Sequence, residues 1–245
     1  MRNYNSRLFR WFKDVKTIPD DTFIRRLRAT VIGEGMLHEG NIYLIDKAIK
    51  NMPQSGYVVE IGVFGGLSTN LILHLLKKNN KPHIMVGCDA WIYEGYSDHK
   101  GRIDSHIDGR NDIERTAYMQ YIKNAYINAV KMLSPNNLPF TCHLKSDEFF
   151  ERWNKKEELI DVFGRPFKLE DKIAFCYIDG DHSFEQTKAD FKNVSQHLLK
   201  GGYILIDDSA KHLDFGSAHF IDEIKKLDNF KIVESNPNYL VQKIK

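Results

Sequence analysis

The sequence predicts an α/β fold in which a doubly wound, mostly parallel sheet of seven strands carries helices on both of its faces. Three observations support this class. Short apolar runs rich in β-branched residues alternate with amphipathic stretches over most of the chain. A glycine-rich turn joins the first such run to the next helix, as in a βαβ unit. The final two runs, at 230–233 and 239–242, lie too close together for a crossover helix, so we expect them to pair antiparallel near one edge.

The N-terminal residues come before the predicted sheet. Residues 1–35 are expected to form a helical segment or lid, because aromatic and apolar residues such as Trp11, Phe12 and Phe23 recur at amphipathic spacing. Three roles are open for this segment: it could act as a lid over a ligand site, form an oligomer contact, or pack on the flank of the domain. Exposed aromatic side chains leave a homo-oligomer open.

Residues 36–245 are predicted to form a single domain that begins with an amphipathic helix at 42–49. The predicted strands cover 57–61, 84–89, 140–144, 173–179, 203–207, 230–233 and 239–242. The predicted helices cover 67–78, 112–132, 184–199 and 217–228, and residues 151–172 are expected to be helix and polar connection. Lysines in the last turn of the helix at 67–78 suit its macrodipole.

An inserted loop and helix is predicted at about 92–135, after the second strand. Residues 93–111 are polar and contain many histidines, aspartates and glycines. The helix that follows is expected to place these residues on one face: Tyr118, Tyr121, Ile122, Ala125, Tyr126, Ala129 and Val130. A long structured excursion is usually functional, so we expect a substrate lid or a partner contact. The spacing of its histidines and aspartates matches no standard metal motif.

Composition indicates an ordinary globular protein. Hydrophobic residues make up 42% of the 245 residues and charged residues 28%, which suffices for a sizeable core. The net charge of +2 argues against a broad nucleic-acid or membrane footprint, and no apolar run is long enough to span a bilayer. The three cysteines lie in apolar strand-like runs and no signal peptide is recognisable, so we expect buried thiols and a cytoplasmic location.

The turn after the first strand has the features of a nucleoside-cofactor site. Gly62 and Gly66 stand where the strand passes into a helix, and glycine there permits a tight turn and the close approach of a ligand. Asp89, at the end of the second strand, is placed to bind two ribose hydroxyls. The dinucleotide fingerprint would need glycine where Phe64 stands. Glu60, at the end of the first strand, suits a cofactor with a cationic amino group better than a pyrophosphate.

Acidic residues gather after two later strands. Asp179, Asp207 and Asp208 offer hard oxygen ligands for Mg²⁺ or a similar ion, which would bind two adjacent substrate hydroxyls and lower the pKa of one. The alternative is that one acid caps the following helix and another is solvated. Asp181 and His182 are candidates for the base that takes the proton of the acceptor. The intrinsic pKa of His182 suits that role, and a structural histidine bonded to a backbone carbonyl is its alternative.

Three segments resemble a known family. Residues 60–69 (EIGVFGGLST) resemble the first motif of class I S-adenosylmethionine-dependent methyltransferases, which have a Rossmann-like fold. Residues 177–184 (YIDGDHSF) and 200–208 (KGGYILIDD) extend the match. They resemble one branch in particular, the metal-dependent O-methyltransferases that tailor sugars in macrolide and aminocoumarin antibiotics. The resemblance leaves out residues 1–30 and the insert at about 92–135.

The resemblance implies roles for individual residues. Those expected to contact the methionine part of the cofactor are Glu60, Gly62, Gly66 and Ser68. The ribose would contact Asp89, and the adenine would contact Ser146, with Asp147 beside it. Asp179 would contact the cofactor as well as the metal, and Asp181 would be the catalytic base. The family usually has glycine where Ser146 stands.

Together these features predict an S-adenosylmethionine- and Mg²⁺-dependent O-methyltransferase that acts on a hydroxyl of a sugar or small glycosylated metabolite. Two alternatives stay open. One is another small-molecule methyltransferase of the catechol type, and the other is a protein that binds the cofactor without catalysis, which the complete acidic set disfavours. A nucleic-acid partner is disfavoured because no basic patch interleaved with aromatic residues appears along one element.

Overall fold

The structure is a computed structural model that describes residues 15–33, 36–92 and 115–245. The predictions for residues 1–14, for the polar loop at 93–111 and for the middle of the turn at 33–36 fall on residues outside this description.

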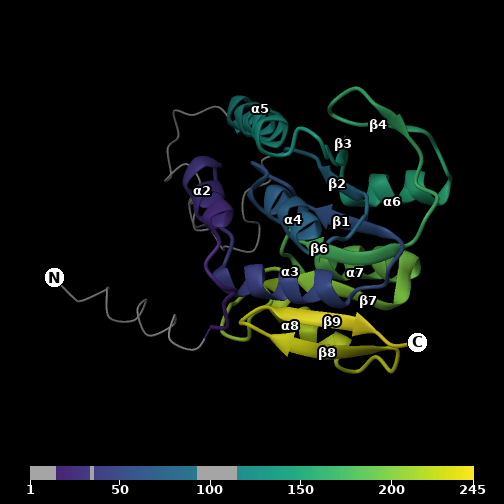
Figure 1. Cartoon of the computed structure of the whole chain (residues 1–245). Helices are drawn as coiled ribbons and strands as arrows, with labels where there is room; N and C mark the ends of the chain where they lie inside the picture. The colour runs from purple at the N-terminus through teal and green to yellow at the C-terminus, as the bar shows by residue number, and fades with distance from the viewer. Residues whose placement is uncertain (1–14, 34–35, 93–114) are drawn as a thin grey trace.

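A single seven-stranded sheet forms the centre of the protein, in the order β3-β2-β1-β6-β7-β9-β8 (Figure 1). Its strands are β1 (Tyr57–Ile61), β2 (Met85–Asp89), β3 (Phe140–His143), β6 (Ile173–Ile178), β7 (Leu198–Ile206), β8 (Phe230–Ser235) and β9 (Tyr239–Lys243). Neighbouring strands pair in parallel except for β9, which pairs antiparallel with both β7 and β8. The predicted fold class is therefore confirmed, including the antiparallel pair near one edge.

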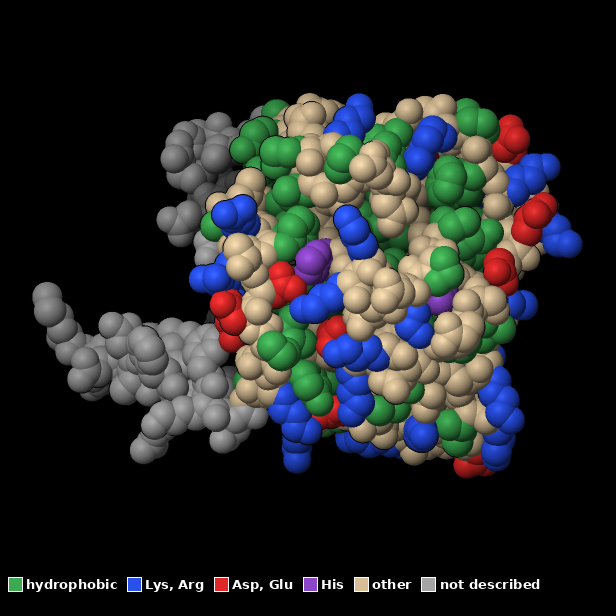
Figure 2. Space-filling view, in the orientation of Figure 1, with side chains coloured by type: hydrophobic (Ala, Val, Ile, Leu, Met, Phe, Trp, Pro, Cys, Tyr) green, Lys and Arg blue, Asp and Glu red, His purple; other side chains and the backbone are tan. Residues whose placement is uncertain are grey.

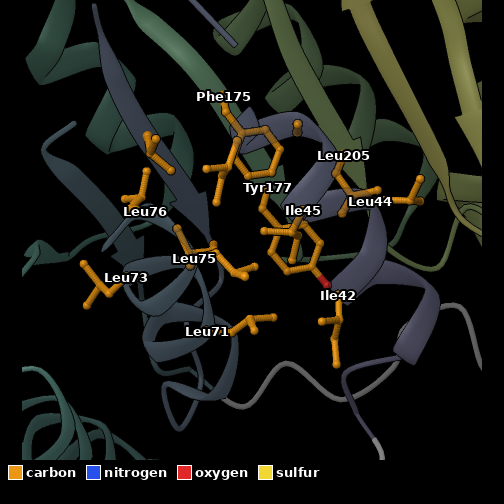
Figure 3. Close-up of a cluster of buried hydrophobic side chains, with 14 of the residues drawn as sticks. Ile42, Leu44, Ile45, Leu71, Leu73, Leu75, Leu76, Phe175, Tyr177 and Leu205 are labelled. Carbon is orange, nitrogen blue, oxygen red and sulfur yellow. The ribbon is translucent and has the colours of Figure 1, made fainter. Parts of the chain in front are cut away.

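The helices form two layers, one on each face of the sheet (Figure 1). They are α2 (Thr22–Thr30), α3 (Glu39–Asn51), α4 (Leu67–Lys78), α5 (Arg115–Leu133), α6 (Ser146–Asn154), α7 (Phe184–His197) and α8 (Gly216–Ile224). Side chains of each strand alternate between the layers. Phe175 and Tyr177 of β6 pack against α3 and α4 (Figure 3), whereas Cys176 and Ile178 face α6, α7 and α8.

Strand β7 begins five residues earlier than the sequence suggested. Lys200–Gly202 was expected to close a helix ending at 199, but α7 ends at His197 and the glycines lie inside the strand. Leu198 is apolar and buried, and it pairs with Ile173 of β6 across a register irregularity. Burial of this leucine in the sheet therefore overrides the glycine pattern, which on its own is typical of a helix end.

A small hairpin that the sequence did not predict joins α6 to β6. Strands β4 (Leu159–Ile160) and β5 (Pro166–Phe167) pair antiparallel in the stretch expected to be helix and polar connection. Asp161 is buried in its turn and accepts hydrogen bonds from the backbone N–H groups of Phe163, at 2.9 Å, and Arg165, at 2.8 Å. An aspartate that bonds its own following backbone is a turn signal that composition alone hides.

Helix α5 connects β2 to β3, and these two strands pair in parallel. A parallel pair requires a crossover, so α5 supplies the connection that the topology demands. Its buried face includes Met119, Ile122, Tyr126 and Val130. The expected face was wrong at Tyr121, which is 60% exposed.

Helix α2 packs on the flank of α4. Ile24 and Leu27 join the apolar cluster of that layer, and Phe23 stacks on the His74 ring with centroids 4.3 Å apart. Asp21 caps α2 and also bonds the side chains of His74 and Lys78. The described part of the N-terminal segment is therefore a packed helix.

The surface in front of α3 and α4 is mixed in character. Figure 2 shows lysine and arginine side chains distributed over this face among acidic and uncharged ones. Within the described ranges, no helix combines the length and the apolar character needed to cross a bilayer.

Candidate active site

A cavity of about 330 Å³ opens at the carboxyl ends of β1, β2, β3 and β6. This is the edge at which open α/β sheets bind their ligands. Among the residues predicted for the site, its lining includes Gly62, Ser68, Asp89, Ser146, Asp179, Asp181 and His182. Four predicted residues do not line it: Glu60, Gly66, Asp207 and Asp208. One cavity thus brings the glycine turn and the predicted base together.

The glycine turn needs its glycines for backbone reasons. Gly62 has φ +81°, and a Cβ there would lie 2.0 Å from the carbonyl oxygen of Asp179. Gly66 has φ +86° at the start of α4, and its Cβ would lie 2.9 Å from the ring of Tyr126. Both positions combine a left-handed conformation with close contact. Gly62 faces the cavity, whereas Gly66 permits α5 to pack behind the turn.

Asp89 is bonded to the turn itself. Its Oδ2 accepts the backbone N–H groups of Val63 and Phe64, each at 2.9 Å, and its Oδ1 accepts that of Trp91 at 2.6 Å. Burial raises the pKa of this carboxyl, and the three backbone bonds oppose the rise. A carboxylate has about four lone-pair positions, so Asp89 keeps acceptor capacity toward the cavity that it lines.

Glu60 lies fully buried behind the turn. Its Oε2 accepts the hydroxyl of Thr69, and its Oε1 has no hydrogen-bond partner among the residues that the structure describes. Burial raises the pKa of Glu60 to about 7, against the effect of hydrogen bonds from Ser68 and Thr69. The cavity-lining Ser68 therefore stands between this carboxyl and any ligand in the cavity.

The raised pKa of Glu60 predicts a pH-dependent loss of stability. Below its ordinary pKa of 4.5 the group is protonated in both states and has no effect. Between about pH 4.5 and pH 7 the group ionises in the unfolded state but stays protonated in the folded state, so the unfolding free energy falls by roughly 3 kcal/mol and then levels off. Glu60→Gln should therefore lose less unfolding free energy than the wild type between pH 5 and pH 8, measured by urea denaturation. Exposed Glu170→Gln should behave like the wild type, and an unchanged slope in Glu60→Gln would contradict the assignment.

The far wall of the cavity is polar. Ser146 begins α6, and its Oγ accepts the Nε2 amide of Gln186 on α7 at 3.1 Å. Asp147 lies beside it and accepts the amide of Asn193 at 3.2 Å. Both α6 and α7 thus contribute hydrogen-bonding groups to this wall.

Three potential metal ligands meet next to the cavity. Asp179, His182 and Asp207 each offer one ligand atom, and these atoms all lie within 4.8 Å of one another. Asp208, which the sequence grouped with the two aspartates, instead places its Oδ2 3.8 Å from Nε2 of His182. The geometry therefore adds a histidine to the predicted acidic set.

The electrostatics of this cluster favour a bound cation. Burial raises the pKa of Asp179 well above its ordinary value, and the charges of Asp207 and Asp208 raise it further. Burial, with Asp207, also raises the pKa of Asp208 to about 6. Carboxylates this close repel one another unless a proton or a cation lies between them. The donor set thus fits a divalent ion.

Two asparagines that the sequence analysis missed hold Asp207 in place. Oδ1 of Asp207 accepts the side-chain amides of Asn41, from α3, and of Asn238, at 2.9 Å. Asn238 also donates to Oδ1 of Asn41 at 3.0 Å. All three side chains are buried. Their positions lie far apart in the sequence, so no local pattern could have joined them.

Asp181 and His182 lie side by side in the sequence but in different surroundings. Asp181 is exposed at the cavity, and its Oδ1 accepts the backbone N–H of Ser183 at 2.8 Å. His182 is half-buried between Asp179 and Asp208, with its ring 5.6 Å from that of Phe215. The carboxylate of Asp181 is thus solvent-accessible, while the imidazole of His182 lies within the acidic cluster.

Known proteins match this chain in sequence and in fold. Residues 59–209 match the family described as "Methyltransferase domain". Protein R132 of Acanthamoeba polyphaga mimivirus, which is uncharacterised, is 24% identical over 150 residues, or 61% of this chain and 50% of that protein. The match thus spans about half the length of that relative.

Two solved structures share the whole fold. The SAH-bound methyltransferase PaMTH1 of Podospora anserina aligns with a TM-score of 0.58 and 12% identity over 100% of this chain and 99% of its own. The O-methyltransferase of Bacillus cereus in complex with SAH aligns with a TM-score of 0.55 and 13% identity over 93% of each chain. Because the family match covers more than half of the sequence, the chain belongs to the methyltransferase-domain family, and it shares the fold of these two methyltransferases.

Proposed function

We propose that the protein transfers a methyl group from S-adenosylmethionine to a hydroxyl oxygen of a sugar or small glycosylated metabolite, with the help of a divalent cation. One observation carries the proposal. The glycine turn, an accessible carboxylate at Asp181 and the cluster of Asp179, His182 and Asp207 are gathered around one cavity. The sugar acceptor rests on the sequence resemblance.

The cavity supports binding of the cofactor. Its volume of about 330 Å³ is within the usual range for small-molecule sites. Gly62 and Ser68 would hold the amino-acid part, Asp89 the ribose and Ser146 the base. Bound there, S-adenosylmethionine supplies an activated methyl carbon attached to a positively charged sulfur.

The acidic cluster supports a cation site. Asp179 and Asp207 would be the carboxylate ligands, and the buried amides of Asn41 and Asn238 fix the orientation of Asp207. A bound divalent ion supplies Lewis acidity that lowers the pKa of an acceptor hydroxyl. Oxygen ligands favour Mg²⁺, whereas coordination by His182 would favour Mn²⁺ or another transition metal.

Residues of the chain supply the remaining chemistry. Asp181 accepts the proton of the acceptor hydroxyl as that oxygen attacks the methyl carbon. The backbone bond from Ser183 fixes one oxygen of this carboxylate. The walls of the cavity would hold the two reactants in line, and such alignment supplies a large part of the acceleration of a displacement reaction. The three buried free cysteines suit a reducing compartment, so we expect a cytoplasmic enzyme.

Calorimetric titration with S-adenosylhomocysteine, with and without Mg²⁺, tests the cofactor assignment. We expect a dissociation constant on the order of micromolar for the wild type and at least about tenfold weaker binding for Asp89→Ala, because the ribose loses a charged acceptor. Asp228→Ala removes an exposed carboxylate that is not part of the cavity lining, so this variant should bind like the wild type. A folded wild-type sample that produces no binding heat would overturn the proposal.

A further inference from the structure

A buried carboxyl group in the far wall of the cavity has one oxygen with no hydrogen-bond partner among the described residues. Asp190, on α7, is 1% exposed and lines the cavity together with Gln186 and Ser146. Its Oδ1 accepts the Nε2 amide of Gln186 at 3.1 Å. Its Oδ2 has no hydrogen-bond partner in the described part of the chain. Buried polar atoms are nearly always paired, so an orphaned oxygen beside a cavity points to a ligand that pairs it.

Asp190 lies at one end of the cavity. Its Oδ2 lies 4.0 Å from the place that a Cβ on Gly180 would occupy, just beyond the end of β6. Helix α7 covers the opposite face of the sheet from α4, which carries Ser68. The cavity therefore extends across the strand ends from the turn at Ser68 to the wall formed by Ser146, Gln186 and Asp190.

We propose that Asp190 determines the specificity for the cofactor base, with its Oδ2 accepting an N–H of the 6-amino group of adenine. This inference rests on the proposed function, because it places S-adenosylmethionine in the cavity. If the amino-acid part lies at the glycine turn, the base is the part that reaches α7. Adenine presents an amino donor at position 6, whereas hypoxanthine presents a carbonyl acceptor there. An ionised carboxylate would pair with the first and repel the second.

Gln186 makes the proposal testable by an isosteric substitution. Its Nε2 donates one hydrogen bond to Oδ1 of Asp190 and another to Oγ of Ser146. The atom at the Oδ1 position of residue 190 must therefore be a hydrogen-bond acceptor. In Asp190→Asn the amide oxygen should keep the Oδ1 position, and the NH₂ group should then replace Oδ2. The variant thus exchanges an acceptor for a donor at the site that faces the base.

The experiment compares the affinities of S-adenosylhomocysteine and its hypoxanthine analogue, S-inosylhomocysteine, by calorimetry at pH 8. That pH lies above the value of about 7 to which burial raises the pKa of Asp190. We expect the wild type to prefer the adenine compound by about tenfold or more, and Asp190→Asn to lose or reverse this preference. Asp190→Ala removes the acceptor without adding a donor, so it should weaken adenine binding while leaving binding of the analogue nearly unchanged.

Glu185→Gln is the matched control, because it neutralises an exposed carboxylate on the same helix that does not line the cavity. It should keep the wild-type ratio of affinities. If the wild type binds S-adenosylhomocysteine but neither Asp190 variant changes the ratio, the inference fails and the proposed function stands. If the folded wild type binds neither compound, both fail.

Discussion

Replacing Asp181 with asparagine is expected to lower kcat by a factor of about 10² to 10⁴ while leaving the affinity for S-adenosylhomocysteine unchanged. Asparagine keeps the shape of the side chain and the acceptor for the backbone N–H of Ser183, but it cannot take a proton from the acceptor. The measurement is transfer of a labelled methyl group to a glycoside that the wild type methylates.

His182→Asn is the informative comparison for this prediction. Because His182 lies 3.9 Å from Asp179 and 3.8 Å from Asp208, its loss should act through the acidic cluster and weaken the response to added cation. The Asp181→Asn variant is expected to keep the wild-type response to added cation. If Asp181→Asn retained wild-type kcat while His182→Asn lost it at saturating cation, the base would be the histidine.

Gly62→Ala is expected to lose at least about 3 kcal/mol of unfolding free energy. The new Cβ would lie 2.0 Å from the carbonyl oxygen of Asp179 and 2.6 Å from its carbonyl carbon, so backbone atoms at the ends of β1 and β6 must separate. The same displacement should disturb the cavity. Urea denaturation measures the first effect and titration with S-adenosylhomocysteine the second.

Gly164→Ala separates the close contact from the backbone strain in this prediction. Gly164 also has φ +81°, but nothing lies within 4 Å of its Cβ position. That variant should therefore lose only about 1 to 2 kcal/mol, the ordinary penalty of a left-handed conformation. Equal losses in the two variants would show that the contact with Asp179 has no effect of its own.

The sequence predicted those parts of the fold and site that depend on local pattern. The run from Glu60 to Thr69 contains a strand end, a turn and a helix start within ten consecutive positions, and β-branched residues mark the buried strands. Composition could not reveal the β4–β5 hairpin, because its turn depends on Asp161 bonding its own backbone. The helical pattern also placed Tyr121 on the buried face, since an aromatic residue alone does not say which neighbour covers it.

Residues that act through tertiary contacts could not be predicted from the sequence. Asn41 lies in the first turn of α3 and Asn238 just before β9, yet both bond Asp207 in the interior. Asp190 lies in a polar helical stretch of the sequence, and only the packing of α7 reveals that one of its oxygens is buried with no partner in the part of the chain that the structure describes. The sequence could name the acids after each strand, but not which amides orient them.

A crystal structure of the protein grown with S-adenosylhomocysteine and Mn²⁺ tests the central claim most directly, because Mn²⁺ can be located by its anomalous scattering. We expect the ligand in the cavity, with its amino-acid part at Gly62 and Ser68 and its base at Asp190. We also expect an anomalous peak bound by Asp179 and Asp207. An empty cavity at saturating ligand, or a cation bound only outside this cluster, would contradict the proposed function.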